Sequence, residues 1–431
     1  MEQKYRFQTR PLSKGPTVSM VNLGCARNLV DAQGILGRLK KNGHSIVDLE
    51  YADIAIVNTC SFIEEARRES IDAILDLIDL KQQGKIKKVI VAGCLAQRYG
   101  KELTRELKGI DAIIGTPRFE KFNIVPQVSL TPNHLAYVKI CESCFNKCSF
   151  CAIPHIKGKF SSRMVESVIE EIKALDRKGV KEINIIGQDI TAYGMDIYRE
   201  KSLARLLKEI VKVINNIRWV RLLYAFPAHM TDELIEVMAR EERICKYIDL
   251  PLQHISDRIL KDMNRNITKE QTLDLVQKIR RHMPRGTLRT TFIVGFPGET
   301  AEEFKELSEF IQETRFERAG VFVYSREEDT DAYGMNRQVP ESVKKERMNF
   351  LMKEQQKISK FISKRFIGQT LDVLIDEKQK NEEDMYIGRT EFDAPEVDGL
   401  VYVRSKKRLK PGDFVPVRIT DAYEYDLTGE A

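Results

Sequence analysis

Three cysteines, Cys144, Cys148 and Cys151, lie within eight consecutive residues of this 431-residue chain, and Phe150 directly precedes the last of them. A loop this short can place three thiolates around one face of a small inorganic cluster. An iron–sulfur cube takes one thiolate on each of four irons, so three cysteines leave one iron open to another ligand. An open coordination position makes a metal site reactive rather than purely structural. The spacing therefore predicts a reactive iron–sulfur site.

A fourth cysteine, Cys141, precedes Cys144 by three residues and leaves a second interpretation open. The run also has the spacing C-x2-C-x3-C-x2-C, which could form a closed four-thiolate zinc or electron-transfer site. Zinc ribbons separate their two C-x2-C pairs by about fifteen residues or more, so the reactive cluster is favoured. Cys245, far from this run, is predicted to be a buried core thiol.

The run resembles the signature of the radical S-adenosylmethionine superfamily, which is C-x3-C-x2-C with an aromatic residue before the third cysteine. The resemblance implies a 4Fe-4S cluster whose open iron binds the amino and carboxylate groups of S-adenosylmethionine. In that superfamily an electron from the cluster cleaves the cofactor and yields a 5′-deoxyadenosyl radical. The cofactor would then carry the chemistry, while the protein orients it and excludes water.

Residues 16–125 repeat a pattern in which a buried strand is followed by an amphipathic helix. The predicted strands are 18–25, 53–60 and 88–94, and the predicted helices are 30–41, 61–80 and 96–108. Gly43, Gly84 and Gly109 lie where these helices should end. Buried strands that alternate with helices predict a parallel α/β domain, in which the ends of the strands gather along one edge of the sheet.

Each of these three strands ends in a cysteine, namely Cys25, Cys60 and Cys94. One such cysteine alone is more often a small buried side chain than a ligand. Three cysteines at equivalent strand ends favour the ligand interpretation, because the sheet would bring them to the same edge. We therefore expect a second 4Fe-4S cluster here, again with one iron left open.

Two segments of this region, Leu23-Gly-Cys-Ala-Arg-Asn-Leu-Val-Asp31 and Asn58-Thr-Cys-Ser-Phe62, resemble the entry motifs of the methylthiotransferase N-terminal domain. Ala26 and Arg27 occupy positions where members of that family vary. The resemblance implies that the second cluster holds or donates sulfur, which is methylated by a second S-adenosylmethionine.

Residues 134–340 repeat the strand and helix alternation six times. The predicted strands are 135–140, 182–187, 219–225, 247–252, 289–295 and 319–324, and the helices between them are 167–178, 203–214, 231–240, 269–282 and 301–314. Six such units predict a barrel or partial barrel with its active site at the C-terminal ends of the strands. The radical S-adenosylmethionine fold is a six-unit partial barrel, so the resemblance agrees with this prediction.

Polar or glycine-rich positions follow several of these strands: Gly187-Gln188-Asp189, Tyr224, Gln253-His254 and Gly295-Phe-Pro-Gly-Glu299. Glycines and polar residues are common in any loop, so His254 is equally open to a purely structural interpretation. No side chain is predicted to act as a catalytic acid, base or nucleophile.

By resemblance, Gln188 and Asp189 occupy the motif that binds the methionine amino group of the cofactor, although the superfamily usually has Gly-Gly-Glu there. Ile293 and Gly295 occupy a strand that contacts adenine in the superfamily. Arg163, which follows the cluster loop, is a candidate cation beside the cofactor carboxylate. The alternative for Arg163 is a solvated arginine at the start of a helix.

The C-terminal part contains a predicted connecting helix, residues 341–366, and a small domain, residues 367–431. Short alternating strands at 371–376, 385–390, 400–404 and 414–420 predict a small closed antiparallel β-barrel. This region resembles a TRAM domain, which is often an RNA-binding module.

The charge of residues 367–431 favours a protein partner over nucleic acid. These residues contain nine Lys or Arg and fifteen Asp or Glu, a net charge of −6, which leaves +12 for the rest of the chain. Nucleic acid binding depends on cations that neutralise phosphates, whereas an acidic surface suits a basic protein. The carboxylates could instead serve only solubility. A basic segment, Arg404 to Lys410, keeps RNA binding open.

Composition gives only broad limits. Hydrophobic residues make up 42% of the chain and charged residues 31%, and no run approaches the about 18 apolar residues that cross a membrane. The first fifteen residues are polar and lack the apolar core of a signal peptide. We therefore expect a cytoplasmic protein whose eight cysteines are reduced and serve as ligands or buried side chains.

The order of these regions resembles the radical S-adenosylmethionine methylthiotransferases over nearly the whole chain. Three segments resemble the branch that modifies an aspartate of a small-subunit ribosomal protein: Leu250-Pro-Leu-Gln-His254, Tyr324-Ser-Arg-Glu-Glu-Asp-Thr330 and Gly388-Arg-Thr-Glu-Phe-Asp-Ala-Pro-Glu-Val-Asp-Gly399. Ser143 and Arg326 replace the Gly and Pro usual in that branch. The partners implied are a basic ribosomal protein and an unidentified electron donor. The alternatives are methylthiolation of adenosine in transfer RNA and a non-catalytic multi-cluster electron-transfer protein.

Overall fold

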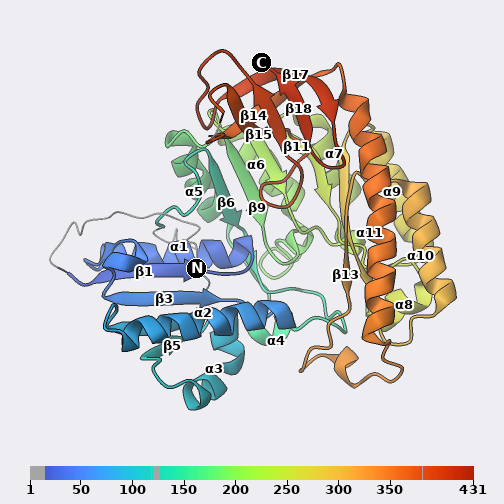
Figure 1. The fold of residues 1–431 in the computed structure, drawn as a ribbon. Coiled ribbons are helices and arrows are strands. Elements are labelled where there is room, and N and C mark those ends of the chain that lie inside the picture. Colours follow the sequence, from blue (N-terminus) through green and yellow to red (C-terminus); the bar gives the residue numbers. More distant parts are fainter. Residues whose placement is uncertain (1–14, 118, 120–126, 381) are drawn as a thin grey trace.

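The computed structural model describes residues 15–117, 119, 127–380 and 382–431. The predicted polar N-terminus, residues 1–14, and the end of the predicted N-terminal domain, residues 120–126, lie outside the described residues. Figure 1 shows a blue N-terminal layer, a central sheet in green and yellow, and a small red barrel at one end of that sheet. In the described part of the chain, no helix has both the length and the apolar character needed to cross a membrane.

The N-terminal domain is a five-stranded sheet in the order β2-β1-β3-β4-β5, and all of its pairs are parallel. The strands are β1 (Thr17–Asn22), β2 (Ser45–Ile46), β3 (Ile54–Thr59), β4 (Lys88–Gly93) and β5 (Ala112–Ile114). The helices are α1 (Ala26–Lys41), α2 (Glu64–Gln82) and α3 (Cys94–Glu106), with a short 3-10 turn η1 (Leu49–Tyr51). The predicted α/β domain is confirmed, and α1 begins four residues earlier than predicted.

The central domain is a six-stranded parallel sheet in the order β13-β12-β11-β10-β9-β6. Its strands are β6 (Leu135–Lys139), β9 (Glu182–Ile186), β10 (Trp219–Leu222), β11 (Ile244–Asp249), β12 (Thr287–Val294) and β13 (Arg318–Val323). Strands β6 and β13 form the two edges of the sheet, so it is a partial barrel, as predicted.

Helices follow the central strands and cover the outer face of the sheet. They are α5 (Val165–Arg177), α6 (Leu203–Val213), α7 (Asp232–Arg240), α9 (Lys269–His282) and α10 (Ala301–Thr314). The short helices α4 (Ile153–Lys157) and α8 (Asp257–Asp262) lie beside the cysteine loop instead. The short pair β7 (Cys141–Glu142) and β8 (Ser161–Ser162) flanks the cysteine loop, and the 3-10 turns are η2 (Ile190–Ala192), η3 (Pro227–His229) and η4 (Asp331–Gly334).

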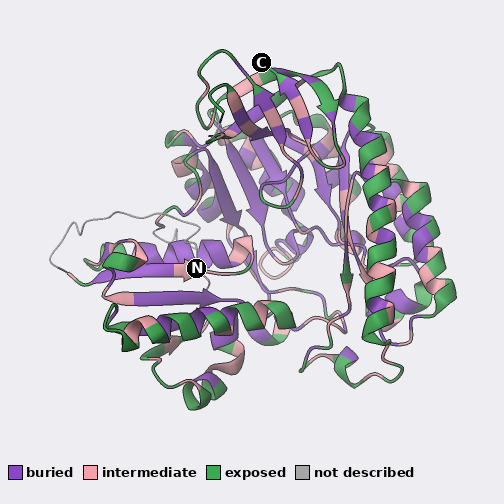
Figure 2. Ribbon diagram, viewed as in Figure 1, coloured by how far each residue is buried: buried purple, intermediate pink, exposed green. Residues whose placement is uncertain are grey.

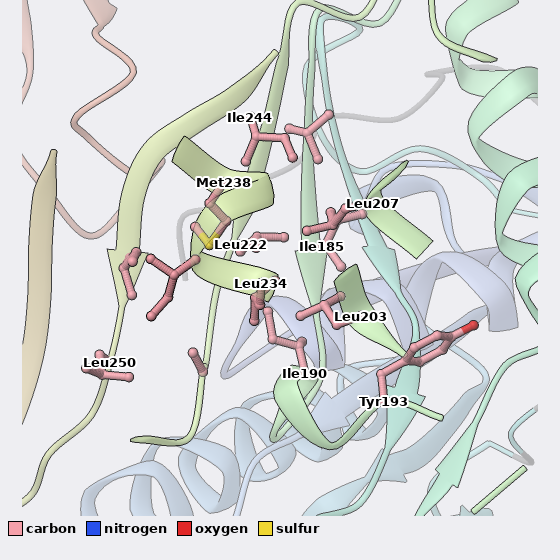
Figure 3. Packing of buried hydrophobic residues seen from close by; sticks show 14 of the residues in the cluster. Ile185, Ile190, Tyr193, Leu203, Leu207, Leu222, Leu234, Met238, Ile244 and Leu250 are labelled. Atoms are coloured by element: carbon pink, nitrogen blue, oxygen red, sulfur yellow. The ribbon is translucent and has the colours of Figure 1, made fainter. Parts of the chain in front are cut away.

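The main core lies between the central sheet and these helices. Figure 3 shows Ile185 and Leu222 on the sheet opposite Leu207 and Met238 on the helices, and all four are buried. Burying a side chain of this size stabilises the fold by about 1.5–3 kcal/mol. Figure 2 shows the complementary pattern, with buried strands and exposed outer helix faces. This packing holds the ends of the strands rigidly in place.

Helix α11 (Glu341–Ser363) does more than connect two domains, which was its predicted role. It packs along β13 and α10 and closes that side of the sheet (Figure 1). Leu351 is fully buried in the central core, and the Gln355 amide donates a hydrogen bond of 2.8 Å to the Phe316 carbonyl. Most of its charged residues are exposed, but Lys344 is buried, and this buried face makes the helix part of the central domain.

The C-terminal domain follows the 3-10 turn η5 (Lys364–Phe366) and is a closed five-stranded barrel in the order β14-β15-β16-β18-β17. The strands are β14 (Thr370–Lys378), β15 (Met385–Arg389), β16 (Val401–Arg404), β17 (Phe414–Ala422) and β18 (Leu427–Glu430). The predicted closed barrel is confirmed. Strand β18 was not expected, and its pairing with β16 is the one parallel pair of the barrel.

The C-terminal domain docks on the N-terminal ends of the central strands, opposite the cysteine loop. Arg389 donates to Glu182, the first residue of β9, at 2.7 Å. Arg318, the first residue of β13, donates to Asp393 at 2.5 Å. The Tyr247 hydroxyl donates to Asp398 at 2.6 Å. Part of the acidic surplus of this domain therefore neutralises cations of the central domain.

Candidate functional site: two facing sets of cysteines

The parallel N-terminal sheet brings Cys25, Cys60 and Cys94 to the same edge. Each follows a neighbouring strand directly, and Cys94 is the first residue of α3. Gly24 has a φ of +86°, and a Cβ placed on it would lie 2.8 Å from the Cβ of Cys60. Only glycine allows the two loops to approach this closely. The structure thus brings the predicted second cysteine set together.

Two asparagines hold these cysteine loops. The Asn28 amide nitrogen donates to the carbonyls of Leu23 at 3.1 Å and Thr59 at 3.0 Å, and its oxygen accepts from the Cys94 thiol at 3.5 Å. The Asn58 amide donates to the Asn28 carbonyl at 2.8 Å. Both asparagines lie inside the two motifs identified in the sequence, but the sequence did not predict that their side chains join the cysteine loops.

Arg27 sets the electrostatics of Cys25. Burial by itself raises the pKa of the Cys25 thiol, but the charge and hydrogen bond of Arg27 outweigh burial and lower the pKa. The Arg27 Nε atom lies 3.4 Å from the Cys25 sulfur, and its Nη1 atom donates to the Gly187 carbonyl at 3.0 Å. This side chain therefore reaches from the N-terminal domain to the end of β9 in the central domain.

The Cys144, Cys148 and Cys151 set lies in one loop at the C-terminal end of β6. Ser149 ties this loop to the end of α8, because its hydroxyl donates to the Asp262 carbonyl at 2.7 Å. Ser143, directly before the set, has a φ of +64° and donates from its hydroxyl to the Gly158 carbonyl at 2.5 Å. The loop is held at both ends by contacts that do not involve the sulfurs.

The donor set fits iron–sulfur clusters. All eight cysteines are free thiols. Burial raises the pKa of Cys94 and Cys151 to about 12 and that of Cys144 to about 11. Such buried sulfurs favour the thiolate form only beside a positive centre, and a cluster supplies that charge. Within the described ranges, no three His, Cys, Asp or Glu side chains surround a single metal ion, whereas a cluster places each thiolate on a different iron.

The two cysteine sets face each other across the domain boundary. Helix α4 directly follows Cys151 and contacts α3, which begins at Cys94. Cys94 packs with Ala152 and Ile156 in one small buried cluster. The positive charge of Arg27 favours the thiolate form of Cys151 as well as that of Cys25. Both sets therefore lie at the same part of the boundary between the N-terminal and central domains.

Four buried charged residues join the two domains beside the cysteine sets. The sequence did not predict this group. Lys139 pairs with Asp31 and Glu142, and Lys157 pairs with Asp31 at 3.0 Å and with Glu142 at 3.3 Å. Burial raises the pKa of Glu142, but the two lysines outweigh it and lower the pKa to about 2. Asp31 follows Cys25 on α1, and Lys157 follows Cys151 on α4, so this group fixes one set relative to the other.

Gln188 and Asp189 follow Gly187 at the end of β9, the strand end where the sequence places them. The Gln188 nitrogen donates to Glu142 at 3.1 Å, and its buried Oε1 atom has no hydrogen-bond partner among the described residues. Such an acceptor fits the ammonium group of S-adenosylmethionine. Asp189 instead accepts from Asn146 at 2.8 Å and from His229 at 2.7 Å, which ties it to the cysteine loop.

Ile293 and Gly295 lie at the end of β12. Ile293 and Phe150 of the cysteine loop both pack against one buried cluster that contains Phe296, and the Ile293 backbone nitrogen donates to the Gln253 carbonyl at 2.8 Å. Gly295 has a φ of +72°, and a Cβ there would lie 2.2 Å from Cγ of Lys344. This strand end therefore shares a hydrophobic cluster with the cysteine loop, and its contact with adenine stays a prediction.

Arg163 is buried and engaged by protein groups. It pairs with Glu171 and donates at 3.0 Å to both the hydroxyl and the carbonyl oxygen of Ser167. Over the described ranges, no hydrogen bond joins Arg163 to a cysteine. The solvated alternative is wrong, because only 6% of Arg163 is exposed. Its contact with the cofactor carboxylate stays a prediction.

His254 is a neutral structural residue in this fold. Its Nδ1 atom accepts from the Ser256 backbone nitrogen at 3.0 Å, and the side chain is fully buried. Burial lowers the pKa of His254 to about 3. Glu299 lies 3.8 Å from its Nε2 atom but pairs with Arg347 of α11. The structural interpretation of His254 is therefore favoured.

The four-thiolate zinc alternative is not supported. Cys141 is fully buried in the main core, and its thiol donates to the Asp189 carbonyl at 3.5 Å. It points into the packing of Gly187, where a Cβ would lie 2.3 Å from the Cys141 sulfur. Cys245 is also buried in a core cluster, as predicted.

Three family models match the chain in the order that the sequence predicts. They are "Uncharacterized protein family UPF0004" over residues 17–115, "Radical SAM superfamily" over residues 138–311 and "TRAM domain" over residues 367–431. A structure of the radical S-adenosylmethionine methyltransferase TsrM from Kitasatospora setae with cobalamin and a [4Fe-4S] cluster bound has a TM-score of 0.51 at 17% identity. That match covers 72% of this chain and 75% of TsrM, and it supports the fold alone.

Relatives of known name match over nearly the whole length. "Ribosomal protein uS12 methylthiotransferase RimO" of Thermoanaerobacter sp. (strain X514) is 47% identical and covers 96% of this chain and 99% of its own. The protein of the same name from Clostridioides difficile (strain 630) is 44% identical, with 96% and 98% covered.

The partial barrel, its three-cysteine loop and the second three-cysteine set define a radical S-adenosylmethionine enzyme of the methylthiotransferase class. Such enzymes use S-adenosylmethionine and 4Fe-4S clusters, and this chain does the same. With relatives at 47% and 44% identity over 96% of its length, the chain belongs to the RimO family of methylthiotransferases. The predicted family, fold class, enzyme class and cofactors are confirmed.

Proposed function

We propose that this chain inserts a methylthio group at the β-carbon of an aspartate in the small-subunit ribosomal protein uS12, the protein named in the descriptions of its relatives. The observation that carries the proposal is the approach of both cysteine sets at the domain boundary, where Arg27 reaches from Cys25 to Gly187 at the end of β9. The β-carbon of aspartate has no proton acidic enough for a general base, so the reaction needs a radical that removes hydrogen.

When bound, the two clusters and S-adenosylmethionine supply the adenosyl radical, the sulfur and the methyl group. The chain itself holds and orients these groups. Cys144, Cys148 and Cys151 bind the cluster that receives the cofactor, and Gln188 accepts from the cofactor ammonium through its unpaired oxygen. The second cluster would be held in the N-terminal domain by Cys25, Cys60 and Cys94.

Buried ion pairs fix the two domains relative to each other beside the cysteine sets. The four-charge group formed by Asp31, Lys139, Glu142 and Lys157 spans both domains, and its side chains are at most 8% exposed. A second contact between the two domains is made by Glu327, which pairs with Arg67 at 2.9 Å and with the buried Arg98 at 3.2 Å. A rigid, water-excluding site protects a reactive radical from side reactions.

The acidic C-terminal domain is the proposed docking site for the basic uS12 substrate. Asp393 and Asp398 are used in contacts with the central domain, but other carboxylates face outward, including Glu382, Glu383 and Asp384. An exposed acidic surface favours encounter with a basic partner. The outward-facing basic segment that contains Lys406 and Lys407 could contact RNA near the same substrate. An electron donor, not identified by the sequence, must supply the reducing equivalents, and a cytoplasmic location agrees with this ribosomal substrate.

Separate cysteine substitutions test the proposed division of labour. Cys148→Ser should abolish both 5′-deoxyadenosine formation and the methylthio mass on uS12, because the cofactor loses its cluster. Cys60→Ser should abolish the methylthio mass but keep 5′-deoxyadenosine formation. Both products are measured by mass spectrometry on anaerobically reconstituted protein. Cys141→Ala is the matched control and should keep both activities, since Cys141 is a core thiol.

Three outcomes would contradict the proposal. Sulfur insertion by Cys60→Ser would remove the second set from the reaction. A methylthio group on adenosine of transfer RNA, with none on uS12, would support the transfer RNA alternative. No 5′-deoxyadenosine from the intact chain under reducing conditions would support an electron-transfer protein instead.

A further inference from the structure

Each cysteine set has one arginine directed at one of its sulfurs. The Nε atom of Arg27 lies 3.4 Å from the Cys25 sulfur, and the Nη1 atom of Arg265 lies 3.7 Å from the Cys148 sulfur. Arg27 is the second residue of α1 in the N-terminal domain, whereas Arg265 follows α8 in the central domain. The two contacts are therefore independent in sequence but alike in geometry.

Both arginines stack on aromatic rings of the same three-residue segment. The guanidinium carbon of Arg27 lies 4.3 Å from the centre of the Tyr224 ring, and that of Arg265 lies 4.0 Å from the centre of the Phe226 ring. Each arginine also donates to a backbone carbonyl, Arg27 to Gly187 and Arg265 to Pro251. Stacking and a second hydrogen bond leave each guanidinium little freedom to move away from its sulfur.

The segment 224–226, which follows Leu223 after β10, is itself held in place. Tyr224 has a φ of +69°, a left-handed conformation that surrounding contacts must hold. Asp249 accepts from the Tyr224 backbone nitrogen at 2.9 Å, and Thr191 accepts from that of Phe226 at 3.0 Å. The segment 224–226 therefore positions both arginines.

A cation and an N–H donor beside a cluster sulfur change the energy of the cluster. One-electron reduction adds negative charge to the cluster, and a nearby positive charge stabilises that reduced form. Hydrogen bonds to the sulfurs act in the same direction and are recognised determinants of cluster potential. Arginine stays charged at every accessible pH, and the low exposure of these sites limits screening by salt.

We propose that Arg27 and Arg265 are a matched pair of positioning residues, each of which raises the reduction potential of the cluster on its own cysteine set. The segment 224–226 holds both guanidinium groups, so this one segment influences the reduction potentials of both clusters. The proposal rests on the proposed function only in that both sets bind clusters. It does not depend on the identity of the substrate.

The test measures each potential separately. One background keeps only the Cys25, Cys60 and Cys94 set, by Ser substitution of Cys144, Cys148 and Cys151. The reverse background keeps only the other set. Reconstituted protein is reduced stepwise without substrate, and the reduced cluster is followed by electron paramagnetic resonance.

The expected result is a crossed pattern. Arg27→Gln should shift the midpoint potential of the Cys25 set to a more negative value and change the other set much less. Arg265→Gln should do the opposite. Arg27→Lys and Arg265→Lys keep the charge but lose the planar stack, so their shifts should be smaller than those of the Gln variants.

Controls separate this effect from general damage. Lys41→Gln, an exposed cation on the same helix as Arg27, and Arg285→Gln, an exposed cation of the central domain, should leave both potentials unchanged. Iron and sulfide analysis shows whether each variant still holds its cluster. If a Gln variant loses the cluster, the Lys variant decides, because its potential must still fall below that of the parent background.

Potentials equal to those of the controls, with cluster content intact, would overturn the proposal. So would equal shifts of both sets from a single substitution, since that would indicate a long-range structural change. A crossed shift together with failure to modify uS12 would support this proposal and reject the proposed substrate, so the two failures are distinguishable.

Discussion

The two cysteine sets, each proposed to hold a 4Fe-4S cluster, are built by two different chain architectures. Cys144 and Cys151 lie in one loop, whereas Cys25 and Cys94 come from separate strands and meet only because the sheet is parallel and in register. The loop set depends on local backbone contacts such as that of Ser149. The strand-end set depends on the whole N-terminal domain and on ties such as Asn28. The second set should therefore be the more sensitive to substitutions far from its sulfurs.

The largest effect should come from the charges that join the two sets. Asp31→Asn leaves Lys139 and Lys157 with only Glu142, and breaking a buried ion pair in this way costs about 3–5 kcal/mol. Urea unfolding of the metal-free chain, followed by circular dichroism, measures the loss. Iron retention should also fall more at the Cys25 set than at the Cys144 set, since Asp31 lies on the helix that follows Cys25.

A surface pair provides the control for that substitution. Glu233 pairs with Lys208 at 2.7 Å, but both side chains are largely exposed, so Glu233→Gln should have little effect. The double substitution Asp31→Asn/Lys157→Met removes one charge of each sign and should recover part of the stability. If Asp31→Asn cost no more than Glu233→Gln, the four charges would not join the domains.

The residues that precede the two sets allow a direct comparison. Gly24 and Ser143 both have positive φ angles, +86° and +64°. Gly24→Ala should cost about 1–2 kcal/mol for the left-handed conformation, and more because its Cβ meets Cys60. Ser143→Gly relieves the same strain but loses a hydrogen bond of about 1 kcal/mol, so it should be nearly neutral.

Iron content of the single-set backgrounds checks this pair of predictions. Gly24→Ala should empty the Cys25 set and leave the Cys144 set loaded, while Ser143→Gly should leave both loaded. Equal iron loss from the two variants would contradict the conclusion that the strand-end set depends more on its neighbours.

Acid sensitivity should be a property of the central domain, where His254 is buried. Its pKa is lowered from 6.5 to about 3, so between these values the unfolded chain binds a proton that the folded chain does not. Stability should therefore fall as the pH drops below about 6.5, by about 2 kcal/mol at pH 5. His254→Asn should reduce the difference in unfolding midpoint between pH 7 and pH 5. An unchanged difference would show that other groups dominate.

The sequence predicted the elements that repeat or lie close together. The loop set follows from residue spacing alone, and Cys25, Cys60 and Cys94 follow from their equivalent positions at strand ends. The contacts that unite the sets were not predictable in this way. Asp31 and Lys157 are 126 residues apart and meet only after two domains have packed. Nothing in either local pattern specifies that meeting.

Charge counting by region also had a limit. The acidic surplus of residues 367–431 suggested a partner, but Asp393 and Asp398 are bound to Arg318 and Tyr247 of the same chain. Likewise, the charged pattern of 341–366 hid a buried face that contains Leu351. Net charge describes a domain in isolation, whereas an intramolecular interface removes part of that charge from solvent.

The docking of the C-terminal domain has a consequence for how such proteins can be recombined. Its residue Ala394 is fully buried, and Asp398 lies 3.4 Å from Arg289 of β12. A homologous C-terminal domain grafted onto this chain would need acidic residues at both the 393 and 398 positions. Without them, Arg318 would lose the carboxylate of Asp393 and Arg289 would lose that of Asp398 at a buried domain interface. The C-terminal domain and the central domain must therefore be exchanged together.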